Sequence, residues 1–167
     1  MTASARSFAS FEAAFAKAFE EEISGETFFA ALAETEPAPR RAALWHKLAV
    51  IENRTDAALR GFATEFGVSP ADETAVQLSG RAEAADWQAL PFLEVMAIMD
   101  RDYPAYVVEF TNLLDRAPEA AKPAAQLLID HEIAIIAMAR AELSGKEDPA
   151  APLDAYLARL AGAADGL

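Results

Sequence analysis

Residues 8–35 read FASFEAAFAKAFEEEISGETFFAALAET, and this stretch decides the class of the fold. Three phenylalanines, Phe8, Phe15 and Phe29, belong to a seven-residue series, and Glu22 occupies its remaining position. Because seven residues are close to two turns of an α-helix, all four side chains share one face. The stretch therefore predicts a long helix whose apolar face contains one carboxylate.

Proline and glycine divide the rest of the chain into further helical segments, because both residues favour helix ends. The chain is rich in Ala, Glu and Leu, and this composition is typical of helices. A connection at 68–85, with one short helix at 74–78, is expected between the second and third long helices. A short C-terminal helix at 153–160 is expected to pack across one end of the bundle. The predicted long helices span about 8–35, 40–66, 86 or 91 to 116, and 118–144.

Two helices, a long crossover and two more helices predict an all-α fold, a four-helix bundle with one long connection. An irregular all-α domain is the alternative. Four helices of at least about 26 residues, each about 40 Å long, pack side by side without overhang. Pro104 should kink the third helix, because its ring clashes with the preceding turn. The length of 167 residues predicts a single domain, 1–167, with core helices over about 8–145.

The composition excludes several classes of protein. With 27 acidic and 14 basic side chains the net charge is −13, which argues against binding a nucleic-acid backbone. The absence of cysteine excludes a zinc finger and a thiol nucleophile. No run of about 18 apolar residues is free of charge, and residues 1–10 lack the apolar core of a secretory signal. No membrane-spanning helix and a cytoplasmic location are therefore expected.

Carboxylates recur on the predicted apolar faces. Glu52 and Glu132 occupy such positions in the second and fourth helices, as Glu22 does in the first. In the third helix Asp100 and Asp102 flank the apolar stripe, and either could turn inward. Burying an unpaired carboxylate costs several kcal/mol, so four of them in one core would need protons or a cation. A divalent metal with oxygen ligands is the compact solution.

A second regularity links the two halves of the chain. A shift of 80 residues superposes Glu22 on Asp102 and Glu52 on Glu132. A helical hairpin that was duplicated and then joined by a crossover would leave this pattern.

These segments resemble the ferritin-like superfamily, in particular its rubrerythrin-like branch, over about 8–145. In that family a Glu on each of the first and third helices and a Glu-x-x-His on each of the other two hold a di-iron pair. The resemblance implies iron as the cofactor, and dioxygen or peroxide reduction or iron oxidation as the reaction. It is carried by Glu22 with FFAAL at 28–32, LWHKLAVIE at 44–52, His131-Glu132, and RAELSG at 140–145.

The chain departs from the family at two positions, because Thr55 and Ile135 stand where the two imidazole ligands are expected. His131 either takes part in a metal centre or forms an interhelical or surface hydrogen bond. The alternative hypothesis is a bundle without metals that acts as a structural or interaction module. The predicted metal ligands are Glu22, Glu52, Asp102, Glu132, Asp100 and His131.

Some apolar residues cannot all face one core. Val50 and Ala57 lie away from the buried face predicted for the second helix, and Val107 and Val108 are adjacent in the third. Either the segment 153–160 or a second subunit must cover them, because large apolar patches are rare on soluble monomers. We therefore expect a homodimer with two-fold symmetry.

Overall fold

The computed structural model describes residues 5–70 and 72–164, with the side chains of 163 and 164 left out. Within these ranges the chain is helical and contains no strand, which confirms the predicted all-α class. No helix in the described ranges is sufficiently long and apolar to span a bilayer. The helices are α1 (Phe11–Thr35), α2 (Pro39–Glu65), α3 (Glu73–Trp87), α4 (Phe92–Asp102), α5 (Pro104–Arg116), a short 3₁₀ helix (Glu119–Ala121), α6 (Lys122–Leu143) and α7 (Ala151–Ala164).

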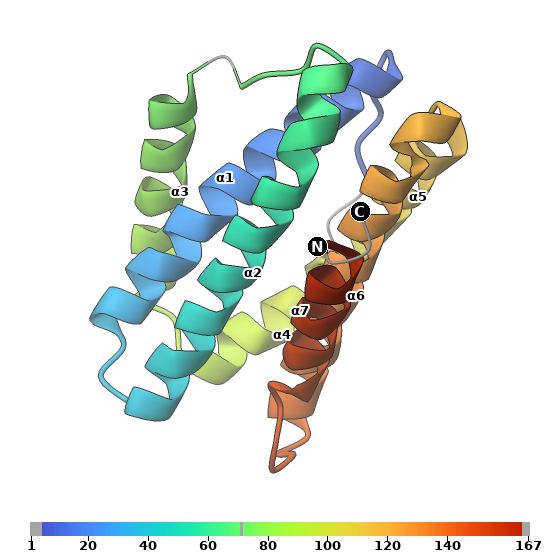
Figure 1. The fold of residues 1–167 in the computed structure, drawn as a ribbon. Coiled ribbons are helices and arrows are strands. Elements are labelled where there is room, and N and C mark those ends of the chain that lie inside the picture. Colours follow the sequence, from blue (N-terminus) through green and yellow to red (C-terminus); the bar gives the residue numbers. More distant parts are fainter. Residues whose placement is uncertain (1–4, 71, 165–167) are drawn as a thin grey trace.

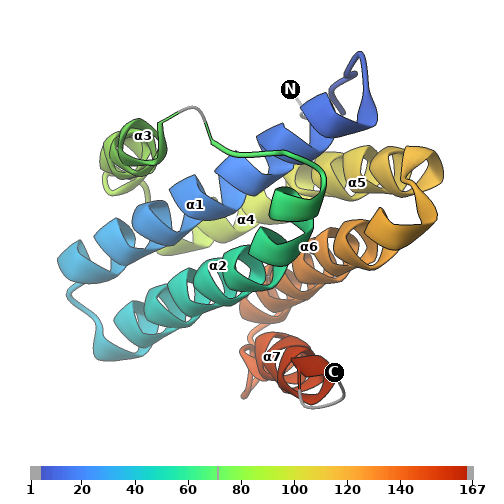
Figure 2. The ribbon, with the colours of Figure 1, turned by 45° about the horizontal axis from the view of Figure 1, so that its top comes forward.

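Two helical units lie against each other (Figures 1 and 2). The first is the hairpin of α1 and α2, and α3 packs on the side of α1 that faces away from α2. The second consists of α4 and α5, which together pack along α6. Contacts of α2 with α6 and of α1 with α5 join the two units. The neighbours predicted from the sequence, first with second helix and third with fourth, are therefore found.

The third predicted helix is broken at the proline. Helix α4 ends at Asp102, Tyr103 stands between the two helices, and Pro104 is the first residue of α5. A proline is favourable at this first position, because a backbone N–H there would have no hydrogen-bond partner within the helix. The predicted kink is thus a full helix boundary.

The crossover helix is longer than expected, because α3 spans Glu73–Trp87 instead of 74–78. Its N-terminus is capped by Asp72, whose carboxylate accepts a hydrogen bond from the amide of Ala75 at 3.0 Å. The only buried residues of α3 are small, Gly80 and Ala84. Helix α3 therefore docks on α1 by close backbone approach, and Trp87 at its end packs edge to face on Phe28 of α1.

The C-terminal helix also differs from the expectation. Helix α7 runs beside α6 and α2 instead of crossing one end (Figure 2). Leu153 and Tyr156 are its fully buried side chains. The Tyr156 hydroxyl lies 2.7 Å from the hydroxyl of Thr55, in the middle of α2. Helix α7 is thus held by buried apolar packing, by this uncharged polar pair and by the ion pair of Asp154 with Lys47 at 2.6 Å.

The apolar core is divided into two clusters. One cluster surrounds Trp45 and Met96, and the other surrounds Phe15 and Phe110. Glu22, Glu52, Glu132 and His131 lie where the two clusters meet along the helices. A polar layer inside an apolar core is costly, so its contents need a physical reason.

Candidate metal centre

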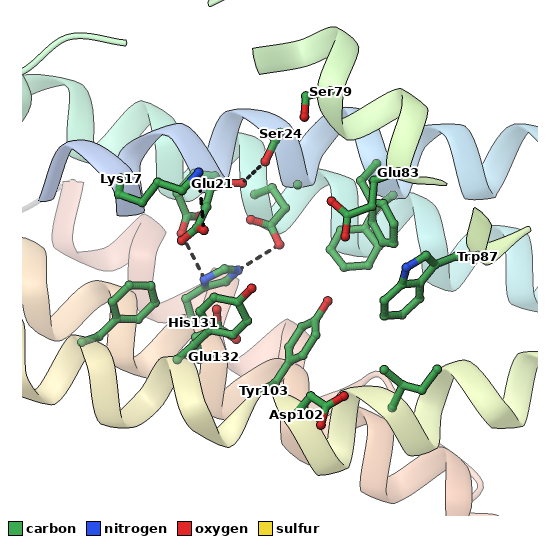
Figure 3. A pocket seen from close by; sticks show the side chains of 18 residues that line it. Lys17, Glu21, Ser24, Ser79, Glu83, Trp87, Asp102, Tyr103, His131 and Glu132 are labelled. Carbon is green, nitrogen blue, oxygen red and sulfur yellow. Dashed lines mark hydrogen bonds and ion pairs between the residues drawn. The ribbon is translucent and has the colours of Figure 1, made fainter. Parts of the chain in front are cut away.

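Three helices bring the polar layer together. Glu22 comes from α1, Glu52 from α2 and His131 from α6. The His131 ring lies between the two carboxylates, with Nδ1 3.4 Å from Glu22 Oε1 and Nε2 3.3 Å from Glu52 Oε1 (Figure 3). One potential ligand atom from each residue lies within 4.8 Å of the others. This spacing suits a metal ion that contacts all three.

The three side chains are almost completely removed from solvent, with exposed fractions of 2% for Glu22, 5% for Glu52 and 2% for His131. Within the described part of the chain, Glu22 Oε2, Glu132 Oε2 and His131 Nδ1 find no hydrogen-bond partner. Buried polar atoms are nearly always satisfied, so each orphan requires an explanation. Two explanations are available: the carboxyl groups hold protons, or a cation is bound between them.

The electrostatics of the site follow from its burial. Burial raises the pKa of Glu52 to about 8. Burial also raises the pKa of Glu22 and of Glu132 well above the usual range, and nearby His131 only partly offsets this. The charge of Glu52 raises both further. Without a cation, these carboxyls therefore hold protons that exposed carboxyls would lose.

A glycine makes room for the centre on α1. A Cβ atom built on Gly25 would lie 2.8 Å from the Glu52 Cδ and 2.9 Å from its Oε2. Such contacts are shorter than real Cβ atoms show, so any side chain at this position must displace the carboxylate. Gly25 therefore lets Glu52 lie directly against the neighbouring helix.

The structure brings four of the six predicted ligands together and leaves the two aspartates, Asp100 and Asp102, outside this group. Glu132 is buried beside the central group and lines the same cleft. Asp102 also lines the cleft and forms an ion pair with Arg101 at 2.6 Å. Asp100 does not reach the centre, because its carboxylate is bound by Arg140 at 2.5 Å. Of the two aspartates in the third helix, Asp102 is thus the one on the cleft side.

The two positions that lack the expected histidines have other roles. Thr55 donates a hydrogen bond to the Ile51 carbonyl at 2.9 Å, so the Tyr156 hydroxyl is the donor in its contact with Thr55. Ile135 packs in the apolar core. The Tyr156 ring lies 5.9 Å from the His131 ring, measured between centroids. Sequence reasoning did not identify Tyr156; its spacing of three from Leu153 was the available signal.

Beside the centre lies a cleft of about 290 Å³ (Figure 3). Glu21 lines this cleft and forms ion pairs with Arg6 at 2.6 Å and with Lys17 at 3.7 Å. Arg6 also binds Glu109 of α5, so it connects α1 with the opposite side of the cleft. The N-terminal segment thus stabilises the position of α5 relative to α1.

Comparison with known proteins adds no relative from which to argue. No protein-family model, no curated protein and no solved structure matches this chain. The chemistry of the site must therefore be argued from its own residues.

Proposed function

We propose that the protein is a ferritin-like metal-binding bundle that holds a divalent transition metal at Glu22, Glu52 and His131, with Glu132 as an additional carboxylate donor. The observation that carries the proposal is the convergence of three ligand atoms within 4.8 Å in a core that leaves buried oxygens without partners. A cation between these groups would satisfy the orphaned atoms and offset the cost of burying their charge.

The donor set supports iron or manganese. Carboxylate and imidazole ligands suit both metals, and the chain has no thiolate that would favour softer ions. Iron is the choice implied by the resemblance to the ferritin-like superfamily, and bound iron would supply one-electron chemistry toward dioxygen or peroxide. Tyr156 and Thr55 support the His131 side of the centre by packing and hydrogen bonding. The pairing of α1 with α2 and of α4–α5 with α6 supports the corresponding bundle topology.

Metal uptake provides the direct test. We expect the protein to bind Fe(II) or Mn(II) stoichiometrically under anaerobic conditions, measured by elemental analysis after desalting and by competition with a dye chelator. The variants Glu22→Gln and Glu52→Gln should bind the metal more than about 100-fold more weakly. Each replaces a charged carboxylate ligand by a neutral amide of similar shape. Asp100→Asn is the matched control, since it removes a carboxylate of the same predicted set that lies outside the centre. Equal losses in the control and the test variants would contradict the ligand assignment.

A second expected result concerns the glycine that accommodates Glu52. Gly25→Ala should weaken metal binding by about 10- to 100-fold, as expected when a group that positions a ligand is changed. The physical reason is that the new methyl group overlaps the Glu52 carboxylate. Gly61→Ala on α2 is the control, because a Cβ built there has no neighbour within 4 Å beyond the adjacent residues and the backbone of its own helix. Unchanged affinity in Gly25→Ala, measured in the same competition assay, would contradict the role of Gly25 in positioning Glu52.

A bundle without metals, acting as a structural or interaction module, is the second candidate. It is favoured by one observation: His131 stands between two carboxylates and can form a charged network with them when protonated. Thermal melting distinguishes the two functions. A tightly bound metal stabilises the folded state by mass action, so adding a chelator should lower the melting temperature of the metal-bound protein. An unchanged melting temperature in metal-saturated protein would favour the second candidate.

Self-association is part of the proposal. Val50 on α2 and Val108 on α5 remain exposed, and so does Leu93 on α4. Helix α7 covers other parts of α2 and α6, so these apolar side chains are left for a second subunit. We expect light scattering at micromolar concentration to give twice the 17.9 kDa of one chain. A mass of one chain would reject the homodimer.

A further inference from the structure

The cleft beside the centre is larger than the smallest substrates require. Dioxygen or peroxide would need little more space than one or two water molecules, at about 30 Å³ each. The cleft offers about 290 Å³, near the lower end of small-molecule sites. It lies between α1 and α3 on one side and α4 and α5 on the other (Figure 3). The space therefore fits a compact organic molecule next to the metal centre.

The charged side chains that line the cleft determine whether it attracts a cationic or an anionic ligand. Lys17 and His131 are the basic groups among the described lining residues, and Lys17 already lies 3.7 Å from Glu21 and 3.9 Å from Glu20. Glu83, exposed on α3, has no ion-pair partner among residues 5–70 and 72–164. An anion would be repelled here, whereas a cation would be attracted. Six carboxyl groups line the cleft, those of Glu21, Glu22, Glu52, Glu83, Asp102 and Glu132. Because Glu22, Glu52 and Glu132 hold protons in the metal-free protein, the attraction for a cation there rests on Glu83.

The walls of the cleft are aromatic. Trp87 from α3 and Tyr103 from the α4–α5 boundary both point into this space (Figure 3). Trp87 meets Phe28 edge to face at 5.2 Å, and Tyr103 meets Tyr106 in the same way at 5.6 Å. Aromatic faces beside a carboxylate are the usual recognition elements for an ammonium group, through cation–π attraction. Apolar walls also accept the uncharged part of an organic cation.

We propose that the cleft binds a small organic cation, a primary amine with a compact apolar body. Its ammonium group lies near Glu83, Trp87 and Tyr103, and its apolar body packs against Phe28 and Tyr106, which line the same cleft. The assignment of this amine as the substrate rests on the proposed function. Binding of the amine itself does not, because the groups that recognise it lie outside the metal ligands.

Three probes of similar shape test the inference on the full-length, metal-free protein. They are 2-phenylethylamine, its uncharged analogue 2-phenylethanol, and the anion 3-phenylpropionate. At low salt we expect the amine to bind at least about 10-fold more tightly than the alcohol, and the anion to bind most weakly. In NMR spectra the indole N–H of Trp87 should shift, whereas that of Trp45, which does not line the cleft, should shift less.

Two glutamate variants with the same change in net charge complete the test. Glu83→Gln should reduce amine affinity by about 3- to 10-fold and leave alcohol affinity unchanged. Glu94→Gln, at an exposed position of α4 outside the cleft, should leave both unchanged. Equal affinity for amine and alcohol, tighter binding of the anion, or an unmoved Trp87 signal would overturn the inference. Amine binding in a protein that takes up no metal would support the site while contradicting the proposed function.

Discussion

Raising the pH from about 5 to about 8 is expected to destabilise the metal-free protein by several kcal/mol. The carboxyl of Glu52 has a pKa of about 8 in the folded state, against 4.5 for an ordinary Glu. The folded state therefore binds more protons than the unfolded state between these values, and stability must fall as the pH rises through this window. Glu52 alone accounts for on the order of 3 kcal/mol at 1.36 kcal/mol per pKa unit. Glu22 and Glu132 act in the same direction.

Urea unfolding of the metal-free protein at several pH values measures this effect. Glu52→Gln should flatten the pH dependence, because the amide keeps the shape of the neutral carboxyl and does not titrate. Glu94→Gln, an exposed carboxylate elsewhere, should leave the slope unchanged. Saturation with metal should reverse the trend, since a metal competes with protons for the same oxygens. A stability that is constant or rises between pH 5 and pH 8 without metal would show that these carboxyls are ionised when buried.

The second large effect is expected at the contact between α3 and α1. A Cβ atom on Gly80 would lie 2.0 Å from the backbone oxygen of Ser24 and 2.5 Å from the Thr27 hydroxyl oxygen. Backbone cannot move aside as a flexible side chain can, so Gly80→Ala must push α3 away from α1. We expect a loss of about 3 kcal/mol in the free energy of unfolding, at the upper end of overpacking effects. Circular dichroism during chemical denaturation measures it.

Gly61→Ala is the matched control for this result. It places the same methyl group in the middle of an exposed part of α2, with open space around it. There the substitution should stabilise the protein by about 0.5 to 1 kcal/mol, because glycine costs more conformational entropy than alanine in a helix. If both variants were stabilising, α3 would not be docked on α1 through Gly80. Because α3 forms one wall of the cleft, its displacement should also abolish amine binding.

The helices were predictable from the sequence where the periodic spacing of apolar residues determines them. The boundaries of α1 and α2 agree with the prediction within a few residues, because long apolar stripes and proline stops act locally. Helix α3 was largely missed, since glycine and alanine dock it and carry little periodic signal. The position of α7 was also missed. It depends on contacts between distant segments, such as that of Tyr156 with Thr55, which are 101 residues apart.

The sequence by itself determined that carboxylates on several helices would be buried, because their helical register is a local property. Only the tertiary structure decided which of them meet. His131 and Glu132 are adjacent in the chain, yet the ring of His131 lies between Glu22 and Glu52. Likewise, Asp102 and not Asp100 lies beside the cleft, because α4 packs with Val95, Met96 and Met99 in the core. Rotation and separation of packed helices arise from contacts between distant segments, and no local pattern encodes them.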